Sequence, residues 1–137
     1  MGTVQTEITL KNIADVFRAE DGHLKPENIR QAAVTAVVDA EKIQLIITEE
    51  LRKKLGLAIK GEDVVIVDSG REIICKKTEP VEIYWKNRSI VLSPLAAAGL
   101  EKVVLGSFPL QSMRLTIDPD SQEVVGIHGE DDDLLVL

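Results

Sequence analysis

Few side chains in this sequence have both the type and the surroundings that chemistry requires. The two histidines, His23 and His128, stand apart and lack the spacing of metal ligands. Ser107 has no histidine beside it, so we expect it to cap a helix rather than to act as a nucleophile. The single cysteine, Cys75, alternates with Ile73 on an apolar run and is expected in the core or in a hairpin. We therefore predict neither a metal site nor a cofactor.

Carboxylates remain, and carboxylates can hold or move protons. Asp118 and Asp120 bracket a proline in a predicted turn, where aspartate is favoured because its side chain bonds the nearby backbone; a calcium site there is the less favoured alternative. Asp68-Ser69-Gly70 lies between two apolar runs, as an ordinary hairpin turn does. Asp39 ends the apolar run 32–38, and its role depends on the fold to which that run belongs.

The elements that must position these residues are mainly strands, because the dominant hydrophobic period is two. A series of short strands and no βαβ spacing predict a mostly β fold, a small closed or sandwiched sheet. Residues 11–28 contain Asp-Gly and Lys-Pro pairs and predict a loop or a long hairpin connection. The predicted strands cover residues 4–10, 32–38, 64–67, 72–75, 81–85, 89–92, 103–105, 114–117 and 123–127.

One helix carries clear start and stop signals. Thr48 can cap it, the two glutamates after Thr48 suit its first turn, and Gly56 can end it in a left-handed conformation. Leu51 and Leu55 form an apolar pair one turn apart. A second short helix is predicted over residues 107–113, and residues 96–100 could form a helical turn.

Composition excludes several classes of function. The 137 residues suit one domain, and 23 acidic against 16 basic residues give a net charge of −7. An acidic chain with 3% aromatic residues is a poor nucleic-acid binder, since phosphate contacts need cations and single strands need stacking faces. No stretch has the length of a membrane helix or the pattern of a secretory signal. We expect a single cytoplasmic domain spanning residues 1–137, without nucleic-acid or membrane partners.

Several blocks, in order, resemble the retropepsin-like (clan AA) aspartic proteases. The run Ala-Val-Val-Asp at 36–39 resembles the strand that delivers the catalytic aspartate, and 46–51 with Leu-Gly-Leu at 55–57 resembles the extended segment and helix that follow. The block 103–107, with Leu110 and the strand 115–118, resembles the late part of the family. The resemblance covers about residues 32–127. It implies a retropepsin-like barrel or sandwich with one or two short helices.

The family's chemistry would assign Asp39 as catalytic, paired with Asp39 of a second copy. Two carboxylates about 3 Å apart share one proton and activate water, so the resemblance implies a homodimer. The family pattern continues with Thr or Ser and then Gly, whereas this chain has Ala40 and Glu41. The hydroxyl that ties the two loops together is lost, and a further negative charge is added. Both changes predict loss of peptidase activity.

Asp68-Ser69-Gly70 matches the family tripeptide better than Asp39 does, but its position argues against it. The stretch from Asp39 to Gly106 leaves room for two hairpins, whereas the stretch from Asp68 to Gly106 is little more than half as long. No capped helix follows Asp68 either. We therefore predict that Asp68, Ser69 and Gly70 form the tip of a flap-like hairpin that contributes to binding.

Three functions stay open at the level of sequence. The first is an inactive retropepsin-fold module that dimerises or binds a peptide, the second an active homodimeric aspartic peptidase using Asp39, and the third an unrelated small β-barrel binding domain. The segment 129–137, an acidic run followed by four apolar residues, either covers its own sheet or pairs with another subunit. Adjacent Asp39 and Gly106 turns, with residues 64–75 projecting as a hairpin, would favour the first two.

Overall fold

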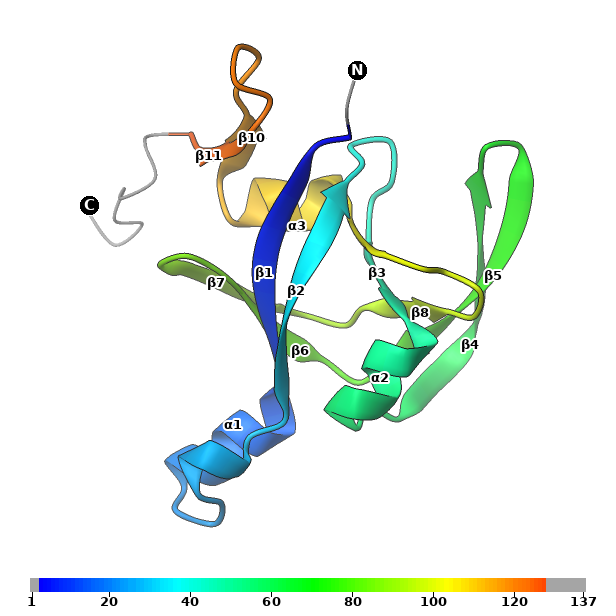
Figure 1. Cartoon of the computed structure of the whole chain (residues 1–137). Helices are drawn as coiled ribbons and strands as arrows, with labels where there is room; N and C mark the ends of the chain where they lie inside the picture. Colours follow the sequence, from blue (N-terminus) through cyan, green and yellow to red (C-terminus); the bar gives the residue numbers. More distant parts are fainter. Residues whose placement is uncertain (1–2, 128–137) are drawn as a thin grey trace.

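The computed structural model describes residues 3–127, and strands are its main regular structure (Figure 1). Nine strands form one mixed sheet in the order β4-β5-β8-β3-β9-β2-β1-β6-β7, and two others form a separate hairpin. The sheet has two ends, at β4 and β7, and it curls without closing completely. The strands are β1 Gln5–Asn12, β2 Gln31–Val38, β3 Leu45–Thr48, β4 Ile59–Asp68, β5 Arg71–Thr78, β6 Val81–Trp85, β7 Arg88–Leu92, β8 Leu95–Ala97, β9 Val103–Leu105, β10 Leu115–Ile117 and β11 Val124–Gly126.

The topological prediction is confirmed. β2 and β9 run parallel, with Val38 opposite Leu105, so the turns at Asp39 and Gly106 leave the sheet side by side. Gly106 leads directly into helix α3 (Ser107–Ser112), and the chain after Asp39 reaches helix α2 (Glu49–Leu55) through β3. The hairpin β4–β5 projects from the body of the molecule (Figure 1).

Helix α2 forms for the predicted reasons. The Thr48 hydroxyl accepts a hydrogen bond from the Leu51 amide at 3.0 Å, and Gly56 ends the helix with φ of 67°. Leu51 and Leu55 face the core. In α3 the prediction for Ser107 is wrong: the capping position is Gly106, Ser107 is the first helical residue, and no side chain caps this helix.

The segment 11–28 is not a loop. Its first residues extend β1, helix α1 covers Ile13–Glu20, and a single 3₁₀ turn, η1, covers Pro26–Asn28. Asn12 caps α1 by accepting a hydrogen bond from the Asp15 amide, and the Asp-Gly pair at 21–22 ends the helix. The pairs that predict a loop therefore mark the ends of elements.

Residues 96–100 are not a helical turn either. Leu95–Ala97 is strand β8, buried between β5 and β3, and the turn that follows it contains Gly99. Strand β3 cannot be separated from the loop before it by pattern, because Leu45, Ile46 and Ile47 are all buried and show no alternation. A fully buried short strand and a buried helical turn have the same hydrophobic pattern.

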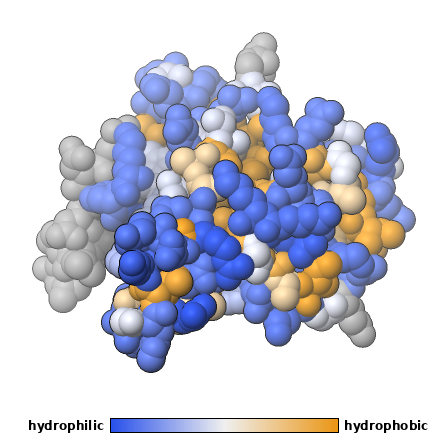
Figure 2. Space-filling model, turned by 60° about the horizontal axis from the view of Figure 1, so that its bottom comes forward, coloured by the Kyte–Doolittle hydropathy of each residue, from blue (hydrophilic) through white to orange (hydrophobic). Residues whose placement is uncertain are grey.

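Two apolar clusters hold the sheet together. The larger fills the curl and includes Leu10, Trp85 and Leu105. The smaller lies between the hairpin β4–β5 and the body, and it contains Cys75 of β5 together with Ile46, Leu95 and Ala97. Val64, Ile66 and Ile73 of the hairpin pack against it. Hydrophobic areas also reach the surface among hydrophilic ones, as Figure 2 shows. Within residues 3–127, no helix is long and apolar enough to cross a membrane.

Candidate functional site

Asp39 lies at the end of β2, in a loop of residues 39–44 that we call the Asp39 loop. Its amide donates to the Leu105 carbonyl at 3.1 Å, which fixes its backbone to β9. Its Oδ1 accepts a hydrogen bond from the Glu41 amide at 3.0 Å, and its carbonyl accepts one from the Lys42 amide. The carboxylate thus closes its own turn, as aspartate commonly does. About a third of the side chain (33%) is exposed.

The far side of the Asp39 loop is held by the start of α3. The amides of Gly106, Ser107 and Phe108 donate to the carbonyls of Gln44, Lys42 and Ile43 at 3.0, 2.8 and 3.0 Å. A Cβ on Gly106 would lie 2.4 Å from the Gln44 carbonyl oxygen. Glycine is therefore required here by close backbone approach, and the family-like late block serves to position the Asp39 loop.

Lys42 joins this loop to the tip of the hairpin β4–β5. Its ammonium lies 3.4 Å from Oδ2 of Asp39 and 3.3 Å from Oδ1 of Asp68. Burial alone would lower the pKa of Lys42, but the hydrogen bond that Lys42 donates to Asp68 and the charge of Asp39 outweigh it and raise that pKa. The site is thus a carboxylate–ammonium–carboxylate chain with the cation in the middle.

Asp68, Ser69 and Gly70 form the hairpin tip, as the sequence predicts. Ser69 and Gly70 have positive φ angles of 53° and 78°, and Asp68 is paired with Arg71 across the turn. Two positive φ angles are the mark of the tight turn that suits a twisted hairpin. The tip is brought to the Asp39 loop through Lys42, so the two sequence candidates belong to one site.

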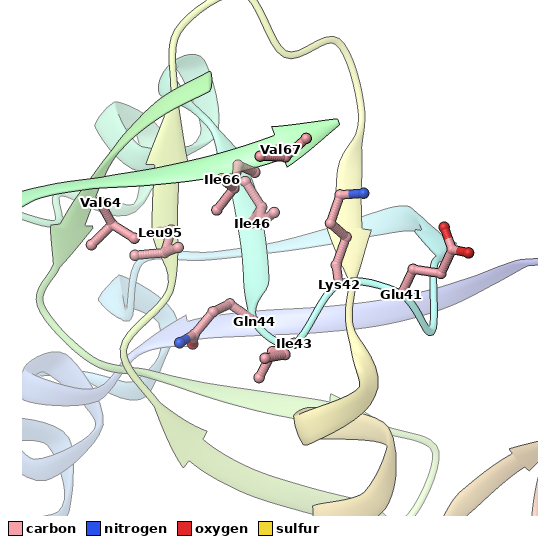
Figure 3. Close-up of a pocket in the computed structure, with 9 residues that line it drawn as sticks. All are labelled: Glu41, Lys42, Ile43, Gln44, Ile46, Val64, Ile66, Val67 and Leu95. Atoms are coloured by element: carbon pink, nitrogen blue, oxygen red, sulfur yellow. The ribbon is translucent and has the colours of Figure 1, made fainter. Parts of the chain in front are cut away.

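A pocket of about 310 Å³ lies between the hairpin and the Asp39 loop. In Figure 3, Lys42 extends from the loop toward β4, whereas the carboxylate of Glu41 points away from the apolar group. Branched aliphatic side chains make up most of the lining. The lining residues are Glu41, Lys42, Ile43, Gln44, Ile46, Val64, Ile66, Val67 and Leu95.

Lys42 is the residue of the candidate site that sequence reasoning missed. A lysine shortly after Asp39 is a visible signal, because the two side chains can meet across a turn. Its second partner, Asp68, is remote in sequence and is brought close only by the folded hairpin. The sequence alone therefore identifies both carboxylates but not the cation between them.

The other sequence candidates lie elsewhere. His23 is exposed, and His128 and the segment 129–137 lie outside the described residues. Cys75 lies on strand β5 of the hairpin with its side chain buried, and burial raises the pKa of its thiol. Oδ1 of Asp118 accepts a hydrogen bond from the Asp120 amide, so this pair has the predicted turn role. Among residues 3–127 no group of three or more His, Cys, Asp or Glu side chains is placed to hold a metal.

Comparisons with known proteins place the fold. No model of a protein family matches the sequence, and no curated protein matches it. Among solved structures, the retroviral protease-like domain of Ddi1 from Leishmania major is similar at a TM-score of 0.58 and 13% identity, over 97% of this chain and 99% of that one. EIAV protease complexed with the inhibitor HBY-793 is similar at a TM-score of 0.55 and 18% identity, over 81% of this chain and 88% of that one. The chain therefore has a mostly β, retropepsin-like fold.

Proposed function

We propose that this protein is a retropepsin-fold binding module without peptidase activity, which dimerises and takes an extended peptide segment under the hairpin β4–β5. The observation that carries the proposal is the state of Asp39. Its carboxylate is occupied by the Glu41 amide and by the Lys42 ammonium, within its own loop.

The chemistry of an aspartic dyad requires the opposite environment. Two carboxylates share a proton because both cannot ionise side by side, and a neighbouring cation removes that restraint by stabilising the ionised form. The Lys42 ammonium lies 3.4 Å from Oδ2 of Asp39, so it takes up an oxygen that a dyad would direct at the second carboxylate. Ala40 lacks the hydroxyl of the family pattern, and Glu41 adds a charge where the pattern has glycine. Each of the three residues opposes the arrangement that the reaction needs.

Peptidase assays test this part of the proposal. We expect no cleavage of an unstructured protein substrate such as casein between pH 3 and 7, by the wild type or by Asp39→Asn. Restoring the family pattern with Ala40→Thr and Glu41→Gly provides the comparison on the same scaffold. Cleavage by the wild type that disappears in Asp39→Asn would refute the proposal and favour a working homodimeric peptidase.

The hairpin pocket supports peptide binding. Ile46 and Leu95 of the body line one side of the pocket, and Val64 and Ile66 of the hairpin line the other. The volume of the pocket suits one or two aliphatic side chains. An extended peptide presents alternate side chains to one face, so an aliphatic residue at every second position fits this lining. The proposed ligand class is therefore an extended segment with alternating branched aliphatic residues.

Neighbouring positions on β4 provide a matched pair for the test. Val64 lines the pocket, whereas Val65 points to the opposite side of the hairpin and is exposed. Fluorescence anisotropy with a labelled Val-Thr repeat peptide should show binding that Val64→Asn weakens at least about tenfold and Val65→Asn leaves unchanged. Tenfold is the loss of one well-buried aliphatic contact of about 1.4 kcal/mol. Equal effects of the two substitutions would exclude the pocket.

Two exposed apolar side chains, one in the Asp39 loop and one in α3, support dimerisation. Ile43 is 66% exposed and Phe108 is 52% exposed, and their backbones are joined by the Phe108 amide to Ile43 carbonyl hydrogen bond. Sedimentation at tens of micromolar should give a dimer for the full chain and a smaller dimer fraction for Ile43→Ser. A version ending at Gly129 tests whether the apolar tail contributes. If the full chain, Ile43→Ser and the shortened version are all monomers, the dimerisation part of the proposal is refuted.

A further inference from the structure

The tip of the hairpin β4–β5 extends beyond the strand that flanks the hairpin. The last backbone pair between the hairpin and its neighbour β8 joins Cys75 to Ala97, and the hairpin beyond this pair has no strand beside it other than its own two. Its inner face rests on the small apolar cluster through Val64, Ile66 and Ile73. The Lys42–Asp68 ion pair joins the hairpin to the rest of the molecule.

The two residues of this ion pair differ in how their backbones are held and in how far their side chains are exposed. Lys42 is 14% exposed and belongs to a loop held by the start of α3, so its ammonium has a fixed place. Asp68 is 50% exposed and lies at the tip, where a small hinge movement of the hairpin would carry its carboxylate out of contact. Asp39 holds Lys42 from the other side, so the cation keeps a partner when Asp68 leaves.

We propose that Lys42 and Asp68 form a latch that holds the hairpin closed over the pocket, and that a ligand enters when this ion pair breaks. The inference concerns the regulation of the proposed binding site and rests on that proposal for its biological meaning. The latch itself is a property of the single chain, so it can be tested without any ligand. Asp39 has the role of anchoring the lysine, in place of a catalytic role.

Cys75 provides a native reporter of opening. It is the single cysteine of the chain, and it is buried in the cluster that the inner face of the hairpin covers. A thiol reagent such as DTNB reaches Cys75 when the hairpin lifts, so the reaction rate in native conditions measures the open fraction. The free energy of unfolding of each variant, measured with urea, identifies any reaction that proceeds through global unfolding.

The hairpin also carries a matched control. Lys76 and Asp63 form an ion pair at 2.7 Å, both half-exposed, but both belong to the hairpin and cannot fasten it to the body. Asp68→Asn and Lys42→Met should raise the DTNB rate of Cys75 about two- to fivefold, the range expected for a partly exposed ion pair. Asp63→Asn and Lys76→Met should leave it within about 1.5-fold, at equal or lower global stability.

Two further results separate the latch from a general loosening. Combining Lys42→Met with Asp68→Asn should give the rate of one substitution alone, because both break the same contact. Raising the salt concentration should accelerate the reaction in the wild type and not in Asp68→Asn. Equal rates for Asp68→Asn and Asp63→Asn, or additive effects of the Lys42 and Asp68 substitutions, would refute the latch.

The outcome also distinguishes the latch from the proposed function. If Asp68→Asn opens the hairpin and the Val-Thr repeat peptide then associates faster, both inferences stand. If the hairpin opens but no peptide binds to either form, the latch stands and the binding proposal fails. If peptide binds and the DTNB rate does not change, the binding site stands and the latch is refuted.

Discussion

Gly106→Ala is the substitution that tests most directly whether the late block positions the Asp39 loop. The new Cβ would lie 2.4 Å from the Gln44 carbonyl oxygen and 2.7 Å from the Ile43 carbonyl carbon, both of them backbone atoms. Side-chain rotation cannot relieve this contact, so the loop has to move away from α3. Such a movement stretches the hydrogen bonds that the amides of residues 106–108 donate to it.

The magnitude follows from three contributions. Overpacking of this kind costs about 1–3 kcal/mol, and weakening one of the three hydrogen bonds adds about 1 kcal/mol. The alanine stiffens the unfolded chain, which returns about 0.5–1 kcal/mol, and φ of −83° at Gly106 adds no strain. We expect the free energy of unfolding to fall by about 1–3.5 kcal/mol. Urea unfolding followed by the fluorescence of Trp85, the single tryptophan and a buried one, measures it.

Gly99→Ala is the control for this experiment. At Gly99 φ is 81° and a Cβ would meet nothing within 4 Å, so its cost comes from backbone strain alone, about 1–2 kcal/mol before the same unfolded-state gain. A loss for Gly106→Ala no greater than that for Gly99→Ala would refute the role assigned to Gly106. The DTNB rate of Cys75 should also rise in Gly106→Ala, because the loop that carries Lys42 has moved.

The remaining predictions concern the supports of the fold. Thr48→Ala removes the cap on the Leu51 amide and should lower the free energy of unfolding by about 1 kcal/mol in urea, whereas Thr48→Ser should preserve it. Hydrogen bonds from Arg30 lower the pKa of Asp15 below its ordinary 3.8, so this carboxylate contributes stability above that pH and loses it as the pH falls through the lowered value. The free energy of unfolding, measured with urea, should therefore fall more steeply between pH 5 and pH 2 in the wild type than in Asp15→Asn. Equal slopes for the two proteins would contradict this explanation.

Local signals are sufficient where one segment determines its own structure. Helix α2 can be predicted because its cap, charges and stop are all within residues 48–56, and the hairpin tip because residues 68–70 favour one turn. Strands β3 and β8 escape prediction because they pair in parallel with each other, buried on both sides, and such strands carry no alternation. Helix α1 is not predicted either, because the segment that follows its capping residue Asn12 contains Asp-Gly and Lys-Pro pairs, which favour a loop.

In the candidate site, too, the sequence predicts the local features but not the contacts between distant segments. Asp39 and Asp68 can be identified because each ends an apolar run. Their connection through Lys42 depends on how far the hairpin bends over the sheet, which the pattern of either strand does not contain. The need for glycine at position 106 cannot be predicted from local sequence either. The backbone that Gly106 approaches belongs to the Asp39 loop, which is remote in sequence and is brought near by the β2–β9 register.

Strand β4 lies at the edge of the nine-stranded sheet, and this position has a consequence for solubility. An edge strand leaves backbone groups available to another chain, and Val64-Val65-Ile66-Val67 is the kind of β-branched run that adds to cross-β aggregates. Asp63 precedes the run and Asp68 follows it, and the register of β4 shifts between residues 59 and 63. Charges at both ends and an irregular strand oppose intermolecular pairing. The aspartate at the hairpin tip thus also protects the edge, and a variant that neutralises both Asp63 and Asp68 should aggregate at concentrations at which either single variant stays in solution.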